Sequence, residues 1–362
     1  MKAVVLAGGF ATRLRPLSCT RPKILFPIVN KPLLEWIFEG LAKNGVDEVV
    51  MAVNCQTEIV LKQHRVQKCG MRIIYSCDPP RKPLGTGGPI KKVEKSIGHG
   101  GSFLVLNGDI FADVNYREIL KVHEEKDAVA TIVLYYVEDP SRYGVVELAN
   151  DNRIKRFVEK PRREDAPTNL INAGIYIFSP EIFKYIPEGR MVSTEREVFP
   201  KLVEEGKLYG YVHDGLWMDI GKPEDYLKIN RILLNSISAY QKFKAGGEVK
   251  INKPVAFDRN VFVGEKSVIG PYTVLGRDVT VGNNVSICDS VVFPETEISD
   301  FASLESAIIG EGVFIGRRVK VGKGCVIGDY VKVGDGVTLG DGVLVCPSKE
   351  VNGETSTIKC II

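Results

Sequence analysis

The chain lacks the features that mark membrane-bound, secreted and nucleic-acid-binding proteins. No apolar run approaches the length of a membrane span, and the opening run, MKAVVLAGG, is too short for a signal peptide. Lys and Arg number 48 against 45 Asp and Glu, and the two signs are interspersed, so no broad positive field points toward nucleic acid. Any phosphate-binding site must therefore be formed by a small group of residues and not by a broad positive surface.

Cysteine pairs at metal-binding or redox spacing are also absent. The eight cysteines are scattered, with no CxxC pair and no histidine at metal-ligand spacing. This pattern predicts buried small residues in a reducing compartment, so we expect a cytoplasmic protein. The apolar share of 44% in 362 residues is enough to build two domains, each with a large core.

The first part of the chain predicts alternating strands and helices. The strands are residues 2–7, 48–53 and 103–106, and residues 32–44 form an amphipathic helix that Gly45 closes. Strand, helix and strand in this order imply a parallel sheet, in which ligands bind beyond the carboxyl ends of the strands. Both the loop at Gly8 and the side chain of Asp109 fall at such ends.

The last part of the chain repeats with a period of six. The recurring apolar residues, most of them followed by glycine, are Val263, Ile269, Leu275, Val281, Ile287, Val292, Ile298, Leu304, Ile309, Ile315, Val321, Ile327, Val333, Leu339 and Val345. This period predicts a parallel β-solenoid with glycine at tight corners. A sandwich of hairpins would instead show alternation with a period of two. We expect domain boundaries at residues 1–240, a linker at 241–254, the solenoid at 255–348 and a tail at 349–362.

The segment LAGGFATRLRPLSCTRPK follows the first strand and combines two glycines with permanent positive charge. Gly8 and Gly9 can bring backbone N–H groups up to phosphate oxygens, and Arg13 and Lys23 add charge. The segment is not a Walker loop, because no GK[ST] follows, and it lacks the GxGxxG of a dinucleotide site. Taken alone, a glycine turn with solvated basic residues explains it equally well.

Five further polar residues follow or open apolar runs. Asp109 in NGDIF and Asp219 in WMDIGKPEDY can converge on a hard cation such as magnesium, although turns and helix caps are the commoner use of either alone. In FVEKP, Lys160 can meet a sugar phosphate and Glu159 can accept sugar hydroxyls, with an exposed charge pair as the alternative. The amide of Asn172, which opens NAGIYIF, can both donate and accept.

In chain order, the segments LAGGFATRLRPLSCTRPKILFPIVNKP, PLGTGG, NGDIF, YGVVE, FVEKP, NAGIYIF and WMDIGKPEDY resemble the sugar-phosphate nucleotidyltransferases over most of residues 1–240. Within that family the likeness is closest to the enzymes that join GTP to mannose 1-phosphate. It includes a C-terminal left-handed β-helix of hexapeptide repeats and the phrases LESAIIG and VCPSKEV. The resemblance implies an α/β fold with a Rossmann-like nucleotidyltransferase domain on a mixed, mostly parallel sheet, followed by that β-helix. Because solenoid faces and ends usually find partners, we also expect a homo-oligomer through the β-helix.

The resemblance also implies roles for individual residues. Arg13 would bind the β- and γ-phosphates of GTP or another triphosphate, Lys23 would bind the α-phosphate and the hexose 1-phosphate, and Asp109 and Asp219 would hold Mg²⁺. The implied nucleotide-binding residues are Leu6, Ala7, Gly8, Gly9, Thr12, Arg13, Gly85 and Thr86, the last two at the base. The implied sugar-phosphate-binding residues are Gly144, Glu159, Lys160 and Asn172.

Ala11 departs from the family pattern GGxGTR, because it stands where the third glycine is usual. If the backbone at this position has a positive φ, alanine costs about 1 kcal/mol relative to glycine. We expect the loop to tolerate Ala11, since its side chain is only a methyl group and both Thr12 and Arg13 are kept.

Three other interpretations stay open. The first is the same class acting on glucose 1-phosphate with thymidine, uridine or adenosine triphosphate. The second is acyl transfer, which hexapeptide solenoids perform with a histidine base; here the last histidine, His213, precedes the repeats. The third is an inactive regulatory subunit that senses a nucleotide sugar. The presence of every charged residue of the motifs favours a working enzyme.

Overall fold

The computed structural model describes residues 1–9, 11–63, 68–79, 84–98, 100–236, 243–353 and 360–361. The chain divides into two compact units, one made of Met1–Gly9 and Leu34–Asp219 and the other of Phe10–Leu33 and Ile220–Ile362. The segment that follows the first strand therefore belongs to the same unit as the repeats. The domain boundaries expected from the sequence stay predictions. Residues 241–242 of the expected linker and residues 354–359 and 362 of the expected tail lie outside the described residues.

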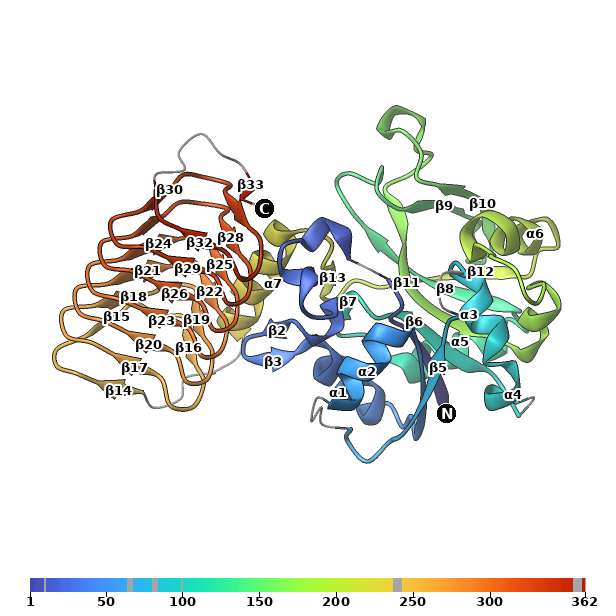
Figure 1. Ribbon diagram of the computed structural model, residues 1–362. Helices are drawn as coiled ribbons and strands as arrows, with labels where there is room; N and C mark the ends of the chain where they lie inside the picture. The colour runs from blue at the N-terminus through green and yellow to red at the C-terminus, as the bar shows by residue number, and fades with distance from the viewer. Residues whose placement is uncertain are drawn as a thin grey trace. The chain divides into compact units, whose positions relative to one another are not determined.

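A mixed sheet forms the centre of the first unit (Figure 1). Its strands follow the order β10-β9-β11-β6-β1-β4-β5, and β8 pairs with both β11 and β12. Strands β5, β4, β1 and β6 are parallel neighbours, whereas β11 runs antiparallel to β6, β8 and β9. The bounds are β1 (Lys2–Leu6), β4 (Glu48–Val53), β5 (Arg72–Cys77), β6 (Phe103–Asn107), β8 (Ala130–Tyr136), β9 (Gly144–Leu148), β10 (Ile154–Glu159), β11 (Leu170–Phe178) and β12 (Leu208–Val212). The predicted α/β class is confirmed.

Helices cover this sheet and bury its alternate apolar residues. The bounds are α1 (Leu33–Lys43), α2 (Cys55–Gln63), α3 (Gly87–Lys92), α4 (Glu94–Ile97), α5 (Tyr116–Glu125), α6 (Phe199–Glu204), and the short helices η4 (Arg163–Asp165), η5 (Pro180–Lys184) and η6 (Thr194–Val198). One apolar cluster joins Val4, Val50 and Val105 of the parallel strands to residues of α3, α4 and α6. A separate antiparallel pair joins β7 (Ile110–Ala112) to β13 (Trp217–Asp219).

The second unit begins with the segment that carries the basic residues of the glycine loop. The elements of this segment are η1 (Thr12–Leu14), η2 (Leu17–Cys19), η3 (Lys23–Leu25), β2 (Pro27–Ile28) and β3 (Lys31–Pro32). Helix α7 (Pro223–Ser236) precedes the repeats in the same unit. The ring of Phe26 packs edge-on against Tyr226 of α7 and Phe293 of the repeats, with centroids 5.9 and 6.2 Å away. Asn30 Nδ2 donates to the carbonyl of Leu275 at 3.0 Å. The segment is thus packed against α7 and the solenoid.

The repeats form three parallel sheets that stack coil upon coil (Figure 1). The first sheet contains β14 (Lys244–Ala245), β17 (Phe262–Val263), β20 (Thr280–Val281), β23 (Glu297–Ile298), β26 (Phe314–Ile315), β29 (Lys332–Val333) and β32 (Glu350–Val351). The second contains β15 (Lys250–Ile251), β18 (Val268–Ile269), β21 (Ser286–Cys288), β24 (Ser303–Glu305), β27 (Lys320–Val321) and β30 (Thr338–Leu339). The third contains β16 (Val255–Phe257), β19 (Thr273–Leu275), β22 (Val291–Val292), β25 (Ile308–Ile309), β28 (Val326–Ile327), β31 (Leu344–Val345) and β33 (Cys360–Ile361).

Every residue of the predicted six-residue series is buried in one apolar core inside the coils, which confirms the predicted β-helix and excludes the sandwich. Strands β14 and β15 lie within the stretch expected to be a linker, and each pairs with a strand one coil later. The glycines at the corners allow close stacking. A Cβ on Gly282, for example, would lie 2.8 Å from the backbone nitrogen of Asp300 in the next coil.

The expectation that the cysteines are buried is wrong. Cys325 is buried inside the solenoid, whereas Cys19, Cys55 and Cys360 are exposed and the other four are half-buried. The exposed cysteines stand at the ends of short elements, which cannot cover them. Cys55 opens α2, for example, and Cys19 closes η2.

Candidate active site

The carboxyl ends of β1 and β6 bring the glycine loop and Asp109 to one edge of the sheet. The N–H of Gly108, directly before Asp109, donates to the carbonyl of Leu6 at 2.8 Å. Asn54, which follows β4, donates through Nδ2 to the carbonyl of Gly8 at 3.0 Å. The two polar features that the sequence placed at strand ends therefore meet, as expected for parallel strands.

Internal packing does not require glycine at positions 8 and 9. Neither residue has a positive φ. A Cβ on Gly8 would make ordinary contacts, the nearest with the backbone nitrogen of Asn54 at 3.6 Å, and a Cβ on Gly9 would meet nothing described within 4 Å. The space over Gly9, next to Leu6 and Ala7 at the end of β1, is thus open for the backbone to approach a ligand closely.

The pairing of β7 with β13 brings Asp109 and Asp219 together across more than a hundred residues of sequence. Its register sets Asp219 opposite Ile110, the residue directly after Asp109. Arg142 Nη2 lies 3.8 Å from Asp219 Oδ2, and its guanidinium lies over the ring of Tyr143, 5.7 Å from the centroid. Sequence reasoning missed Arg142, although it stands directly before YGVVE.

A buried tyrosine hydroxyl marks where several acidic side chains gather. Asn172 Nδ2 donates to the hydroxyl of Tyr176 at 3.0 Å. Burial, reinforced by the negative charges of Glu195, Glu159 and Asp109, raises the pKa of Tyr176 well above its ordinary value. These carboxylates come from η6, β10 and the turn between β6 and β7, so the structure brings Asp109 and Glu159 within electrostatic range of the hydroxyl that Asn172 contacts.

The start of β9 and the end of β10 hold three of the predicted sugar-phosphate residues. Gly144 pairs directly with Glu159, and a Cβ on Gly144 would lie 2.5 Å from the ring of Phe157 and 3.0 Å from Glu159 Oε2. Lys160 Nζ lies 3.2 Å from Glu159 Oε1, and the lysine side chain is 60% exposed. The site therefore has an accessible cation next to a half-buried carboxylate.

Gly85 and Thr86 have clear structural roles. Gly85 has a φ of +73°, and a Cβ there would lie 2.4 Å from the carbonyl oxygen of Val192. The hydroxyl of Thr86 donates to Glu195 Oε2 at 2.7 Å and accepts from the N–H of Thr194 at 3.0 Å. Their assignment to a base stays a prediction. Sequence reasoning did not select Glu195, because the segment TEREV has the composition of an ordinary surface helix.

The second unit holds Thr12, Arg13 and Lys23. Thr12 and Arg13 lie exposed in η1, and Lys23 begins η3 half-buried. Ala11 has φ 46° and ψ 43°, which is the left-handed region of backbone conformation. Alanine at this position therefore costs free energy relative to glycine.

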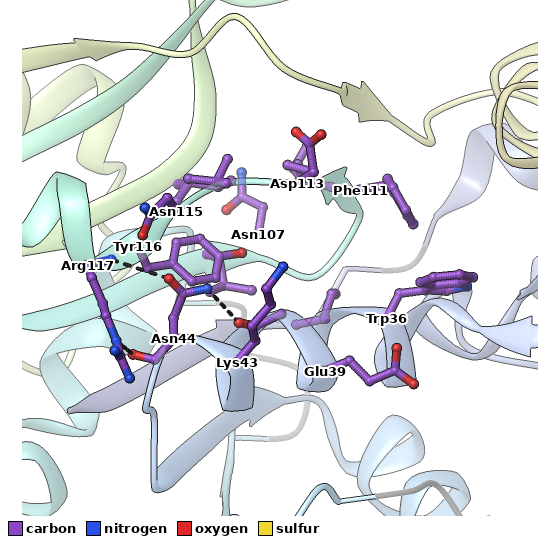
Figure 2. A pocket seen from close by; sticks show the side chains of 17 residues that line it. Trp36, Glu39, Lys43, Asn44, Asn107, Phe111, Asp113, Asn115, Tyr116 and Arg117 are labelled. Carbon is purple, nitrogen blue, oxygen red and sulfur yellow. Dashed lines mark hydrogen bonds between the residues drawn. The ribbon is translucent and has the colours of Figure 1, made fainter. Parts of the chain in front are cut away.

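A cavity of about 580 Å³ lies between α1, the β6–β7 turn and α5 (Figure 2). Trp36 and Phe111 pack edge-on at 5.6 Å along its wall, and Asn44 and Arg117 hydrogen bond at its rim. The cavity reaches Asn107 and Ile110 on either side of Gly108 and Asp109, but none of the predicted site residues lines it. It is a separate feature of the first unit.

The described residues contain neither a three-residue metal cluster nor a membrane-spanning helix. In those parts of the chain, no three His, Cys, Asp or Glu side chains gather closely enough to hold a metal. None of the described helices combines the length and the apolar character that crossing a bilayer requires.

Comparison with known families assigns the class. The family model described as Nucleotidyl transferase matches residues 2–236, and the chain belongs to this family. A second model, described as GMPPB C-terminal domain, matches residues 251–361.

The relatives narrow the likeness further. The chain is 40% identical over 268 residues to the mannose-1-phosphate guanylyltransferase catalytic subunit beta of Danio rerio, covering 72% of this chain and 74% of that protein. It is 38% identical over 268 residues to mannose-1-phosphate guanylyltransferase 1 of Arabidopsis thaliana, covering 73% of each. Among solved structures, HddC from Yersinia pseudotuberculosis is similar with a TM-score of 0.54 and 29% identity, covering 64% of this chain and 99% of that one. HddC has also been solved complexed with GMP-PN.

Proposed function

We propose that this protein forms GDP-mannose and pyrophosphate from GTP and mannose 1-phosphate. The relatives named above support these substrates. The observation that carries the proposal is the register of β7 and β13, which puts Asp219 opposite the neighbour of Asp109. Two carboxylates thereby stand at the sheet edge where Gly9 leaves backbone open to a ligand.

The reaction is an in-line displacement at phosphorus. A phosphate oxygen of the sugar 1-phosphate attacks the α-phosphorus, a new P–O bond forms, and the bond to the β-phosphate breaks as pyrophosphate leaves. The attacking phosphate is already ionised at neutral pH, so the protein needs no general base and no covalent intermediate. It must instead orient two polyanions and relieve the repulsion between them.

The cationic residues of the motifs supply that relief in this proposal. Arg13 is assigned to the β- and γ-phosphates, Lys23 to the α-phosphate and Lys160 to the sugar phosphate. The backbone N–H groups of Gly8 and Gly9 add neutral donors at the phosphates.

The polar residues near Tyr176 are assigned to the sugar. Glu159 can accept from hydroxyls with the oxygen that Lys160 does not hold. Asn172 already accepts from the N–H of Gly174 at 2.9 Å and donates to Tyr176. One N–H of its amide and the second lone pair of Oδ1 are left for a sugar hydroxyl, so Asn172 can still donate or accept.

Magnesium is the cofactor that these residues fit best. Mg²⁺ is commonly bound through one or two carboxylates, with phosphate oxygens and water completing its shell, and Asp109 and Asp219 offer that set. When bound, the ion would neutralise negative charge on the phosphates. Assembly through the β-helix and a cytoplasmic location stay predictions from the sequence.

A panel of substrates tests the proposal. Pyrophosphate release would be measured with GTP, ATP, UTP and dTTP, each paired with mannose, glucose and N-acetylglucosamine 1-phosphates, with magnesium and with a chelator. We expect the highest kcat/KM for GTP with mannose 1-phosphate, and loss of release with the chelator. A higher value for glucose 1-phosphate with another triphosphate would reassign the substrates. No release from any pair, with nucleotide sugar still bound, would identify a sensor.

A further inference from the structure

Two cysteines that belong to none of the sequence motifs stand side by side at the edge of the first unit. Cys55 opens α2 and is exposed, whereas Cys77 closes β5 and is half-buried. The register of β4 and β5 sets Cys77 opposite Val53, two residues before Cys55. The two sulfur atoms lie 3.1 Å apart. Parallel pairing, not a CxxC spacing, brings these thiols together.

We propose that Cys55 and Cys77 are a disulfide-forming pair. A bonded pair of sulfurs is about 2.05 Å apart, so closure requires a movement of about 1 Å from the separation seen here. The exposed position of Cys55 on the first turn of α2 gives an external oxidant access to one member of the pair. Cys77 then lies within reach of the sulfur that has reacted.

The reaction balances with a low-molecular-weight disulfide as the oxidant. Cys55 loses its proton to solvent, and its thiolate attacks one sulfur of the oxidant, which releases one thiol. Cys77 then loses its proton, attacks the Cys55 sulfur in the mixed disulfide and releases the second thiol. Overall the protein loses two protons and two electrons, and the oxidant takes up the same number and is reduced to two thiols.

The surroundings of the pair set the order of these two steps. Burial, together with hydrogen bonds to Cys55 and to the carboxylate of Glu58, raises the pKa of the Cys77 thiol. A thiol with a raised pKa is mostly protonated and reacts slowly with an external disulfide. Cys55 is therefore the thiol that reacts first with the oxidant, and Cys77 resolves the mixed disulfide.

The bond would fix the segment that holds the glycine loop. Asn54 lies directly before Cys55 and donates to the carbonyl of Gly8 at 3.0 Å. Next to Cys77, the N–H of Asp78 donates to the carbonyl of Val53 at 2.8 Å. A disulfide adds a covalent tie to these two hydrogen bonds, so the oxidised protein is expected to resist unfolding better than the reduced one.

Peptide mapping tests the proposal without any measure of activity. Full-length protein would be reduced, incubated with oxidised glutathione, blocked with N-ethylmaleimide, digested with trypsin and examined by mass spectrometry without reductant. We expect tryptic peptides 44–62 and 73–81 to be joined and to separate on reduction. Cys55→Ser and Cys77→Ser should each abolish the joined species. Cys69→Ser, which removes the cysteine between them in sequence, should leave it unchanged.

The melting temperature gives a second measurement. We expect the oxidised wild type to melt about 5 °C or more above its reduced form, with no such difference in Cys55→Ser. Two outcomes would overturn the proposal: Cys77 blocked by N-ethylmaleimide while Cys55 carries glutathione, or either cysteine joined to a different one. A joined pair that melts no higher than the reduced protein would overturn the expectation that the bond stabilises this segment.

Discussion

Arg21 donates from Nη2 to Asp329 Oδ2 at 2.9 Å, and the two residues are 308 positions apart in the sequence. The same nitrogen donates to Glu311 Oε2 at 2.7 Å. Asp329 is 1% exposed and also accepts from the hydroxyl of Thr20 at 2.6 Å. A buried ionic network within the second unit therefore joins the segment before Lys23 to the coils of the β-helix.

We expect Arg21→Ala to destabilise the second unit strongly. Burial opposes the charge on Arg21, but the attraction of Asp329 and Glu311 outweighs burial, and the pKa of the guanidinium is raised. Removing one partner of such a pair leaves the other buried without compensation, which typically costs about 3–5 kcal/mol. Denaturant unfolding followed by circular dichroism would measure the loss.

Arg277→Ala is the matched control. Arg277 Nη2 also lies 2.9 Å from a carboxylate, that of Glu295, but the two side chains are 37% and 51% exposed. An exposed pair contributes at most about 1 kcal/mol, so this variant should unfold nearly like the wild type. Equal small losses in both variants would mean that the Arg21 network adds nothing beyond a surface pair.

Ala11→Gly should stabilise the protein slightly and change turnover little. The φ of 46° at Ala11 costs an L-residue about 1 kcal/mol, and glycine removes that cost. Because Thr12 and Arg13 are kept, we expect kcat within a few-fold of the wild type in a pyrophosphate-release assay. A tenfold rise in kcat would contradict the expectation that the loop tolerates alanine.

The sequence predicts the two architectures well because each is encoded locally. A period of six repeats in every coil, so many residues carry the same signal, and each member of the series is buried in the solenoid. The strand ends next to Gly8 and Asp109 are likewise fixed by short apolar runs that stop at polar residues. Parallel pairing then brings these ends to one edge without any further information.

The remaining features depend on register and packing between distant segments. No local pattern shows that Asp219 pairs opposite Ile110, or that Arg21 forms an ion pair with Asp329 of the β-helix. At Gly85 the sequence motif suggests a functional role, but the structure also gives a packing reason for the residue. The motif PLGTGG suggests a base contact, whereas its positive φ and the nearby carbonyl of Val192 give it a structural reason to be glycine.

We expect stability to fall between pH 6.5 and 4 because of His123. This residue is 1% exposed, and its ring nitrogens contact the hydroxyls of Thr131 and Ser179 at 2.9 and 3.0 Å. Burial lowers the pKa of His123 from 6.5 to about 4. The unfolded chain therefore binds the proton first as pH falls, and the stabilisation present above pH 6.5 is lost toward pH 4.

At its limit, the loss in the free energy of unfolding caused by protonation of His123 is about 3 kcal/mol. Urea unfolding midpoints measured from pH 7.5 to 4 would follow it, with His123→Gln as the control, since glutamine can make similar hydrogen bonds and does not titrate. The wild type should lose stability faster than the variant in this window. Parallel curves would contradict the assignment of the loss to His123.

Asp109→Asn should lower kcat at saturating magnesium by at least about a hundredfold, the scale of one lost electrostatic contact in a preorganised site. Asparagine keeps the size of the side chain, so the loss would come from the charge, and a higher magnesium concentration for half-maximal rate should accompany it. Asp151→Asn is the control, because Asp151 lies half-exposed in the turn between β9 and β10. Its kcat should match the wild type. Near-normal turnover of a folded Asp109→Asn protein would remove Asp109 from the metal site, and the β7–β13 register would then serve the fold alone.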